Sequence, residues 1–155
     1  MKTKKTAKKY SRLSQVEKMI LVGNLYVPRG VEQDLCARFD RLRQRAPLIS
    51  GSDCLWLTGS PGVGETSILK RYVERFPVSL NNDQIERPIV YVNVPAMRGA
   101  SALIGAMLDA LEMPMANCGT LFNRVSALKS FLKCQRVQMV VLDDVQNLLD
   151  EGGAS

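Results

Sequence analysis

One glycine-rich stretch has the residue types and the spacing of a phosphate-binding loop. Gly59, Gly64 and Thr66 occupy fixed positions of the pattern G-x-x-x-x-G-K-[ST]. Glycines at these positions let the backbone fold tightly enough for successive N–H groups to point at phosphate oxygens. The candidate phosphate-binding residues are Gly59, Ser60, Pro61, Gly62, Val63, Gly64, Glu65, Thr66 and Ser67. The pattern predicts a site for the phosphates of ATP.

One position of the pattern is occupied by the wrong charge, because Glu65 stands where the lysine should be. At about 4 Å and an effective dielectric constant near 20, two unit charges interact by roughly 4 kcal/mol. Replacing an attraction by a repulsion should therefore weaken ATP binding by on the order of a thousandfold. Hydrolysis should be largely lost, because the lysine also stabilises transition-state charge. A decayed copy, a sequence variant, an engineered change and a natural pseudo-ATPase would all account for this residue.

Two carboxylates follow an apolar run near the end of the chain. Residues 139–142 are Met-Val-Val-Leu, and Asp143 and Asp144 come next. This is the Walker B pattern, in which a buried strand delivers a carboxylate to a bound Mg²⁺. We expect Thr66 and Asp143 to hold the metal and Asp144 to act as the catalytic base. Because Asp144 is one methylene shorter than the usual glutamate, it should place the base less well. The alternative is a strand that ends in two solvated acids.

Alternating strands and helices must position these motifs. Apolar or β-branched runs predict three strands, at 54–58, 88–94 and 137–142. The spacing of apolar residues, with Pro and Gly between segments, predicts helices at 31–45, 67–76, 101–111 and 120–134. A capping box at Ser14 and Glu17 predicts the start of a shorter helix that ends at about Val22. The alternation predicts an α/β fold, with a parallel sheet covered by helices.

The net positive charge is concentrated at the N-terminus. The 155-residue chain has 21 Lys and Arg, 15 Asp and Glu, and a formal net charge of +6. Six of the basic residues are Lys2, Lys4, Lys5, Lys8, Lys9 and Arg12, which leaves 15 basic and 15 acidic residues elsewhere. We expect a disordered tail that could contact DNA by displacing counterions from phosphates. A solvated arm without a partner is the equally weighted alternative.

Three arginines of the expected 31–45 helix share one face. Arg38, Arg41 and Arg45 lie at i, i+3 and i+7. Such a face could contact DNA or a partner protein, but a solvated helix face is the interpretation we favour.

Several classes of protein are excluded by what the sequence lacks. The chain has no histidine, and its four cysteines form no C-x-x-C pair, which argues against a zinc site and against a secreted disulfide framework. No apolar run approaches the roughly 18 residues that a membrane span needs. We expect reduced cysteines and a cytoplasmic protein without a membrane partner.

The two motifs together resemble the AAA+ branch of the P-loop ATPases, and their flanks resemble the TniB/TnsC family of transposition ATPases. The flanking features are the arginine-rich helix, residues 57–64 and 68–72, and the run 143–149, which is similar to Asp-Glu-x-(His/Gln)-x-Leu-Leu. The resemblance covers roughly residues 28–149. It implies an α/β ATPase that assembles as a homo-oligomer on DNA, binds ATP and Mg²⁺, and bridges target DNA and a transposase.

The resemblance also implies segments that do not follow Walker B here. In AAA+ folds the next strand carries a polar sensor residue and lies between the P-loop strand and the Walker B strand, and later segments supply an arginine finger and a lid. Without the sensor strand, we expect the strands at 54–58 and 137–142 to have unpaired edges.

We therefore predict a P-loop NTPase core that is incomplete at its C-terminal end. The expected parts are a basic tail (1–13), a helical segment (14–46) and a partial AAA+ core (47–155). The predicted function is a regulator or target selector in DNA transposition with weak or no ATP hydrolysis. The alternatives are a non-catalytic DNA-binding or protein-interaction module with the same fold, and an AAA+ protein of replication initiation.

Overall fold

The computed structural model describes residues 14–23, 30–46, 53–82, 84–96, 99–114 and 118–149. The chain divides into two compact units, Met1–Asp34 and Leu35–Ser155. Helix α3 (Gly30–Arg45) begins in the first unit and continues into the second. Within the described ranges no helix has the length and apolar character to cross a membrane.

Helix α2 (Gln15–Gly23) of the first unit begins with the predicted capping box. The backbone N–H of Ser14 donates to Oε2 of Glu17 at 2.8 Å, and the backbone N–H of Glu17 donates to Oγ of Ser14 at 3.2 Å. These bonds to Ser14 hold the pKa of the Glu17 carboxyl below its ordinary value. The sequence signature and the observed helix start agree because capping is a local interaction.

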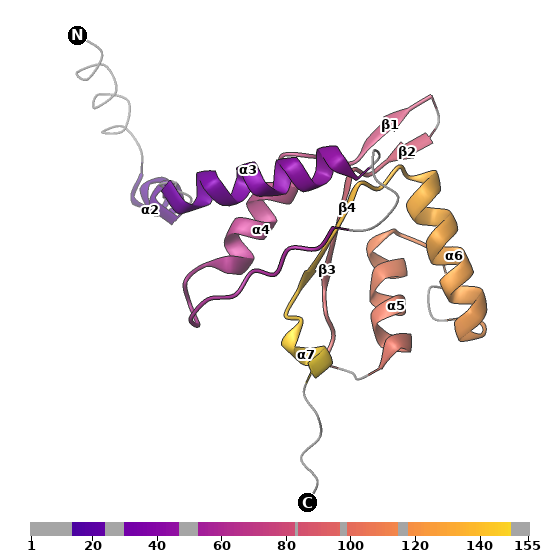
Figure 1. The fold of residues 1–155 in the computed structure, drawn as a ribbon. Helices are drawn as coiled ribbons and strands as arrows, with labels where there is room; N and C mark the ends of the chain where they lie inside the picture. Colours follow the sequence, from indigo (N-terminus) through magenta and orange to yellow (C-terminus); the bar gives the residue numbers. More distant parts are fainter. Residues whose placement is uncertain are drawn as a thin grey trace, which may run out of the picture. The chain divides into compact units, whose positions relative to one another are not determined.

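A parallel pair of strands lies at the centre of the second unit (Figure 1). Strand β3 (Ile89–Asn93) pairs with β4 (Met139–Asp143), with Ile89 opposite Met139 and Asn93 opposite Asp143. Helices α5 (Ala100–Ala110) and α6 (Leu121–Cys134) form the crossover that a parallel connection requires. The strands predicted at 88–94 and 137–142, their parallel pairing and both helices are confirmed.

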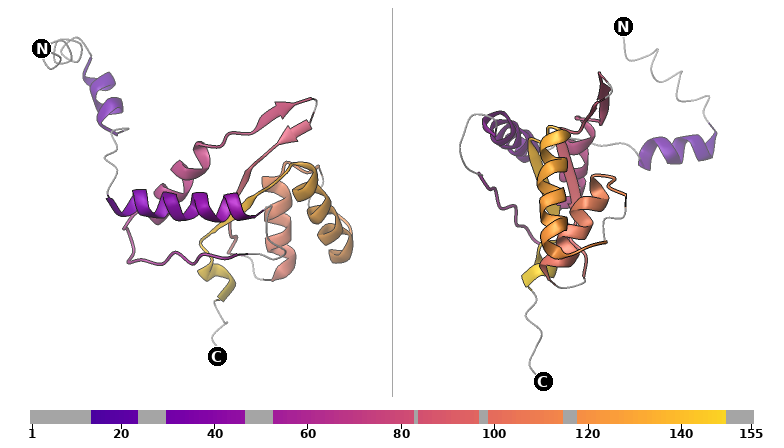
Figure 2. Two further views of the ribbon diagram at one scale, coloured as in Figure 1. Left: turned by 45° about the horizontal axis from the view of Figure 1, so that its top comes forward. Right: turned by 90° about the vertical axis from the view of Figure 1, so that its right-hand side faces the viewer.

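Each face of this sheet is covered by helices. Because side chains alternate along a strand, Val90 and Val92 face α5 and α6, where they pack with Leu108, Leu111 and Leu128. The other face packs against α3 and α4 (Glu65–Glu74), and its buried residues are Phe39, Tyr72, Ile89 and Val141. In the right-hand view of Figure 2, the face of the sheet that α5 and α6 cover is turned toward the viewer. Burial on both faces explains why the strands read as nearly continuous apolar runs.

Aromatic packing and a hydrogen bond join α4 to α3. The rings of Phe39 and Tyr72 meet edge to face with centroids 5.0 Å apart. The Tyr72 hydroxyl donates to Oδ1 of Asp40 at 2.8 Å. Burial, and then the bond to Asp40, raise the pKa of the Tyr72 phenol to about 12. This contact fixes the helix that follows the glycine-rich loop.

Three short elements were not predicted from the sequence. Strands β1 (Ser79–Asn81) and β2 (Gln84–Glu86) form an antiparallel hairpin, in which Leu80 pairs with Ile85. Asn82, with a φ of 49°, lies at its turn, whereas Asp83 lies outside the described residues. Helix α7 (Gln146–Leu149) follows β4. Segments of three or four residues are too short to show a periodicity.

The predicted strand at 54–58 is wrong. Residues 53–59 form neither helix nor strand, and the Trp56 side chain is 67% exposed. A strand needs a neighbour for its backbone N–H and C=O groups, and in the described part of the chain β4 pairs with β3 alone. The paired sheet is therefore smaller than predicted, and within the described ranges neither the 54–58 segment nor the second edge of β4 has a strand paired with it.

Candidate functional site

The glycine-rich loop uses glycine where its backbone demands it. Gly62 and Gly64 have φ angles of 83° and 97°, in the left-handed region that glycine adopts without strain. The Val63 N–H closes a turn by donating to the Ser60 carbonyl at 3.2 Å. Gly64 is the N-cap of α4, and among the described residues no side chain caps this helix end with a hydrogen bond. The first N–H groups of α4 thus have the arrangement that binds anions at helix N-termini.

Glu65 places a carboxylate inside this loop. A β-carbon at Gly59 would lie 3.0 Å from Oε1 of Glu65, so the acid folds back against the first glycine of the pattern. This oxygen is buried and has no hydrogen-bond partner among the described residues. The positive end of the helix dipole stabilises an acidic residue in the first turn of α4. The same negative charge repels a second anion, such as a phosphate, at this helix end. The loop backbone fits a phosphate, whereas Glu65 does not.

Both acids of the second motif are held by hydrogen bonds. Asp143 ends β4 and is 7% exposed. Its Oδ2 accepts a 2.5 Å hydrogen bond from the Tyr91 hydroxyl, and its Oδ1 accepts one from the Asp144 N–H at 3.1 Å. Asp144, with a φ of 58°, accepts from Nδ2 of Asn93 and from Nε2 of Gln146, each at 3.1 Å. Asp143 is therefore a buried, oriented carboxylate and not a solvated strand end.

Tyr91 and Asn93 are site residues that sequence reasoning missed. They alternate along β3 and therefore share the sheet face on which Asp143 lies. Burial, followed by the hydrogen bond to Asp143, raises the pKa of the Tyr91 phenol well above its ordinary value, so the proton stays on Tyr91. Nζ of Lys70 lies 5.7 Å from the centroid of the Tyr91 ring. The sequence signal that could have identified them is a pair of polar side chains at alternate positions near the end of an apolar strand.

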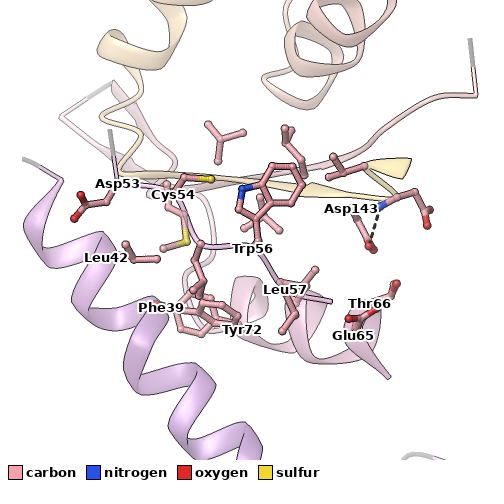
Figure 3. Close-up of a pocket in the computed structure, with 18 of the residues that line it drawn as sticks. Phe39, Leu42, Asp53, Cys54, Trp56, Leu57, Glu65, Thr66, Tyr72 and Asp143 are labelled. Atoms are coloured by element: carbon pink, nitrogen blue, oxygen red, sulfur yellow. Dashed lines mark hydrogen bonds between the residues drawn. The ribbon is translucent and has the colours of Figure 1, made fainter. Parts of the chain in front are cut away.

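A cavity of about 750 Å³ brings the two motifs together (Figure 3). Its walls include the irregular segment 53–58, strand β4 and the residues just after β4. Of the predicted site residues, the cavity is lined by Glu65, Thr66, Asp143 and Asp144. The other predicted residues, Gly59 to Gly64 and Ser67, lie outside its lining.

The oxygen donors around this cavity suit Mg²⁺. The Thr66 hydroxyl and the carboxylates of Asp143 and Asp144 are hard ligands of the kind that Mg²⁺ prefers. Within the described ranges, no three His, Cys, Asp or Glu side chains lie close enough to hold a metal together. The donor set therefore fits a metal bound by one or two carboxylates, with other ligands from phosphates and water.

The other features singled out in the sequence are the arginines of α3, the cysteines and the basic tail. Arg45 forms an ion pair with Asp53, with 3.5 Å between Nη1 and Oδ2, and Nε of Arg41 donates to the Ala37 carbonyl at 3.3 Å. The cysteines 36, 54, 118 and 134 are free thiols, as expected. The basic tail, 1–13, lies outside the described residues.

Comparison with protein-family models matches residues 26–154 to the family described as bacterial TniB protein. The matched range contains the glycine-rich loop, both acids and every described element of the second unit. No curated protein matches the chain. Because the family match covers most of the sequence, the protein belongs to the bacterial TniB family of transposition-associated AAA+ proteins.

Proposed function

We propose that this TniB protein is a regulator or target selector in DNA transposition that has weak or no ATP hydrolysis. The observation that carries the proposal is the Glu65 carboxylate, which lies against Gly59 and has a buried oxygen without a hydrogen-bond partner among the described residues. A nucleotide phosphate at the start of α4 would meet this negative charge. The rest of the framework supports a nucleotide-binding ancestry, because the family match spans the loop and both acids, and Glu65, Thr66, Asp143 and Asp144 line one cavity.

The proposed roles of the residues follow from their positions. Thr66 and Asp143 would hold Mg²⁺, which supplies positive charge beside phosphates when it is bound. The N–H groups that begin α4 would face the phosphates. Asp144 would be the base, and its carboxylate is already oriented by Asn93 and Gln146. Glu65 opposes the ligand that all of these residues would serve.

Calorimetric titration with Mg²⁺ and ATP tests the proposal. We expect no micromolar binding by the unmodified protein and a gain on the order of a thousandfold in Glu65→Lys. Glu74→Lys is the matched control, since it makes the same charge change at the exposed, far end of α4. Micromolar binding by the unmodified protein, or an equal gain in the control, would contradict the proposed role of Glu65.

The proposal includes partners. Family membership supports a transposase or another transposition protein, DNA and further copies of this chain as partners. The six positive charges before residue 13 would contact DNA phosphates. DNA binding should then weaken steeply with salt, and deletion of residues 1–9 should abolish it. Unchanged affinity after the deletion would reject this contact.

The non-catalytic DNA-binding alternative differs in its response to nucleotide. It predicts DNA binding that ignores ATP both in the unmodified protein and in Glu65→Lys. The transposition regulator predicts that ATP affects DNA binding once Glu65→Lys restores the site. DNA affinity of both proteins, measured with and without ATP, separates the two functions. The family match favours transposition over replication initiation.

A further inference from the structure

Asp143 receives a hydrogen bond across the sheet from a residue on the neighbouring strand. The Tyr91 hydroxyl, 52 positions away in sequence, donates to Oδ2 of Asp143 at 2.5 Å. The other oxygen, Oδ1, accepts from the adjacent Asp144 N–H at 3.1 Å. Two donors, one on β3 and one just after β4, bond to the two oxygens and therefore fix the plane of this carboxylate.

We propose that Tyr91 is a positioning residue, whose hydroxyl holds the Asp143 carboxylate in the orientation in which it meets a divalent cation. The inference rests on the proposed function for the presence of the cation. It adds a residue, and a role, that neither of the two sequence motifs contains.

The register of the sheet makes this contact specific. Tyr91 lies opposite Val141, and Asp143 is two residues further along β4 on the same face. The Tyr91 ring packs against the cluster that includes Ile89 and Val141, which restricts its movement. Its hydroxyl is thus carried to Asp143 by a packed ring on a paired strand, and not by a mobile surface side chain.

The Asp143 carboxylate needs such a donor. The terminal torsion of an aspartate is broad, so its rotamer alone does not fix the carboxylate plane. A carboxylate has about four lone-pair positions, so two donors leave capacity for a metal or a metal-bound water. Without the Tyr91 hydroxyl, the Asp144 N–H would be the one donor left to this carboxylate among the described residues. Partners behind metal ligands typically contribute tenfold or more to metal affinity.

A second tyrosine–aspartate pair in the same unit provides the comparison. The Tyr72 hydroxyl donates to Asp40 at 2.8 Å, and Tyr72 is buried. Tyr72 itself lines the cavity that contains Asp143, but its partner Asp40 lies on α3 and does not. Loss of either hydroxyl removes one tyrosine–carboxylate hydrogen bond, but only loss of the Tyr91 hydroxyl should change cation binding.

The experiment measures Mn²⁺ binding to the full chain, without nucleotide, by electron paramagnetic resonance. Tyr91→Phe should raise the Kd for Mn²⁺ by on the order of tenfold. Tyr72→Phe should leave that Kd unchanged, although both variants should lower the thermal unfolding midpoint. Asp143→Asn should weaken Mn²⁺ binding at least as much as Tyr91→Phe does, because it removes the oriented charge itself.

Two results would overturn the inference. One is an unchanged Mn²⁺ affinity in a folded Tyr91→Phe protein, and the other is Mn²⁺ binding that is absent or insensitive to Asp143→Asn. Should Tyr91→Phe fail to fold, Tyr91→Trp, which keeps a large aromatic ring but places no hydroxyl at Asp143, is expected to show the same loss of affinity. ATP binding by Glu65→Lys tests the proposed function separately, so failure of one proposal is distinguishable from failure of the other.

Discussion

The carboxylate of Glu65 lies against Gly59, and a β-carbon at Gly59 would come within 3.0 Å of its Oε1. The first glycine of the loop and the residue that replaces the lysine are therefore neighbours in space, although six positions separate them in sequence. Glu65 thus adds charge and also fills room that the loop would offer to a phosphate. Charge and shape make different predictions for substitutions at this position.

Glu65→Gln separates charge from shape. The amide has nearly the same size as the carboxylate but carries no charge, so it removes the repulsion without adding an attraction. We expect an ATP affinity between those of the unmodified protein and Glu65→Lys, and the differences should narrow as salt screens the charges. Calorimetric titration at low and high salt measures this series. If Glu65→Gln binds ATP no better than the unmodified protein, steric exclusion and not charge blocks the site.

Two loop glycines should respond differently to alanine. Gly64→Ala should cost about 1–2 kcal/mol of unfolding free energy, because its φ of 97° strains any residue with a β-carbon. Gly59→Ala should cost under about 1 kcal/mol, since the atoms nearest to its β-carbon would belong to side chains, Val63 Cγ2 at 2.7 Å and Glu65 Oε1 at 3.0 Å, and Val63 is 46% exposed.

Urea unfolding of both alanine variants measures the difference. Gly30→Ala is a suitable control, because no atom of the described residues lies within 4 Å of a β-carbon at this position in α3, and alanine favours a helix. A larger cost for Gly59→Ala than for Gly64→Ala would show that close contacts, and not backbone conformation, select glycine in this loop.

Local signals in the sequence predicted much of this fold. The side chain of Thr120 caps α6 by accepting from the Asn123 N–H at 3.3 Å, and Ser14 with Glu17 caps α2. Apolar runs predicted β3 and β4 because both are buried from two sides. Each of these interactions joins residues that are close in sequence or needs only a repeated pattern.

Features that depend on distant neighbours could not be predicted in this way. The segment at 54–58 has the composition of a strand, but strand formation also requires an adjacent backbone, which local composition does not specify. Similarly, the Tyr91 hydroxyl reaches Asp143 only through the register of β3 and β4. The motif residues of the site were identifiable from spacing, whereas the side chains that orient them were not.

Alkaline pH should destabilise the protein through Tyr72. Burial, and then the bond to Asp40, raise the pKa of this phenol from 10.0 to about 12. The folded state therefore keeps a proton that the unfolded chain loses, so the stabilising contribution is complete below pH 10.0 and disappears as pH rises to about 12. Tyr72→Phe cannot lose this proton.

The difference in stability between the unmodified protein and Tyr72→Phe isolates the contribution of the Tyr72 phenol. Urea unfolding on both sides of pH 10.0 should show that the unmodified protein loses more stability than Tyr72→Phe does. The comparison cancels the parallel contribution of Tyr91, which both proteins retain. Identical pH profiles would contradict a role for Tyr72 in alkaline unfolding.

Asn147 should stabilise the segment that follows the two acids. Its side-chain Nδ2 donates to the carbonyl of Val94 at 2.8 Å, and Val94 is fully buried. Asn147→Ala would leave this carbonyl without that donor, and we expect a loss of about 1–3 kcal/mol in unfolding free energy.

Gln146→Ala is the control, because Gln146 is exposed in the same short helix and its amide bonds to Asp144 instead. Urea unfolding should give the control a cost of about 0.5 kcal/mol or less. Equal costs for the two variants would show that the bond to Val94 does not anchor α7 to the end of β3.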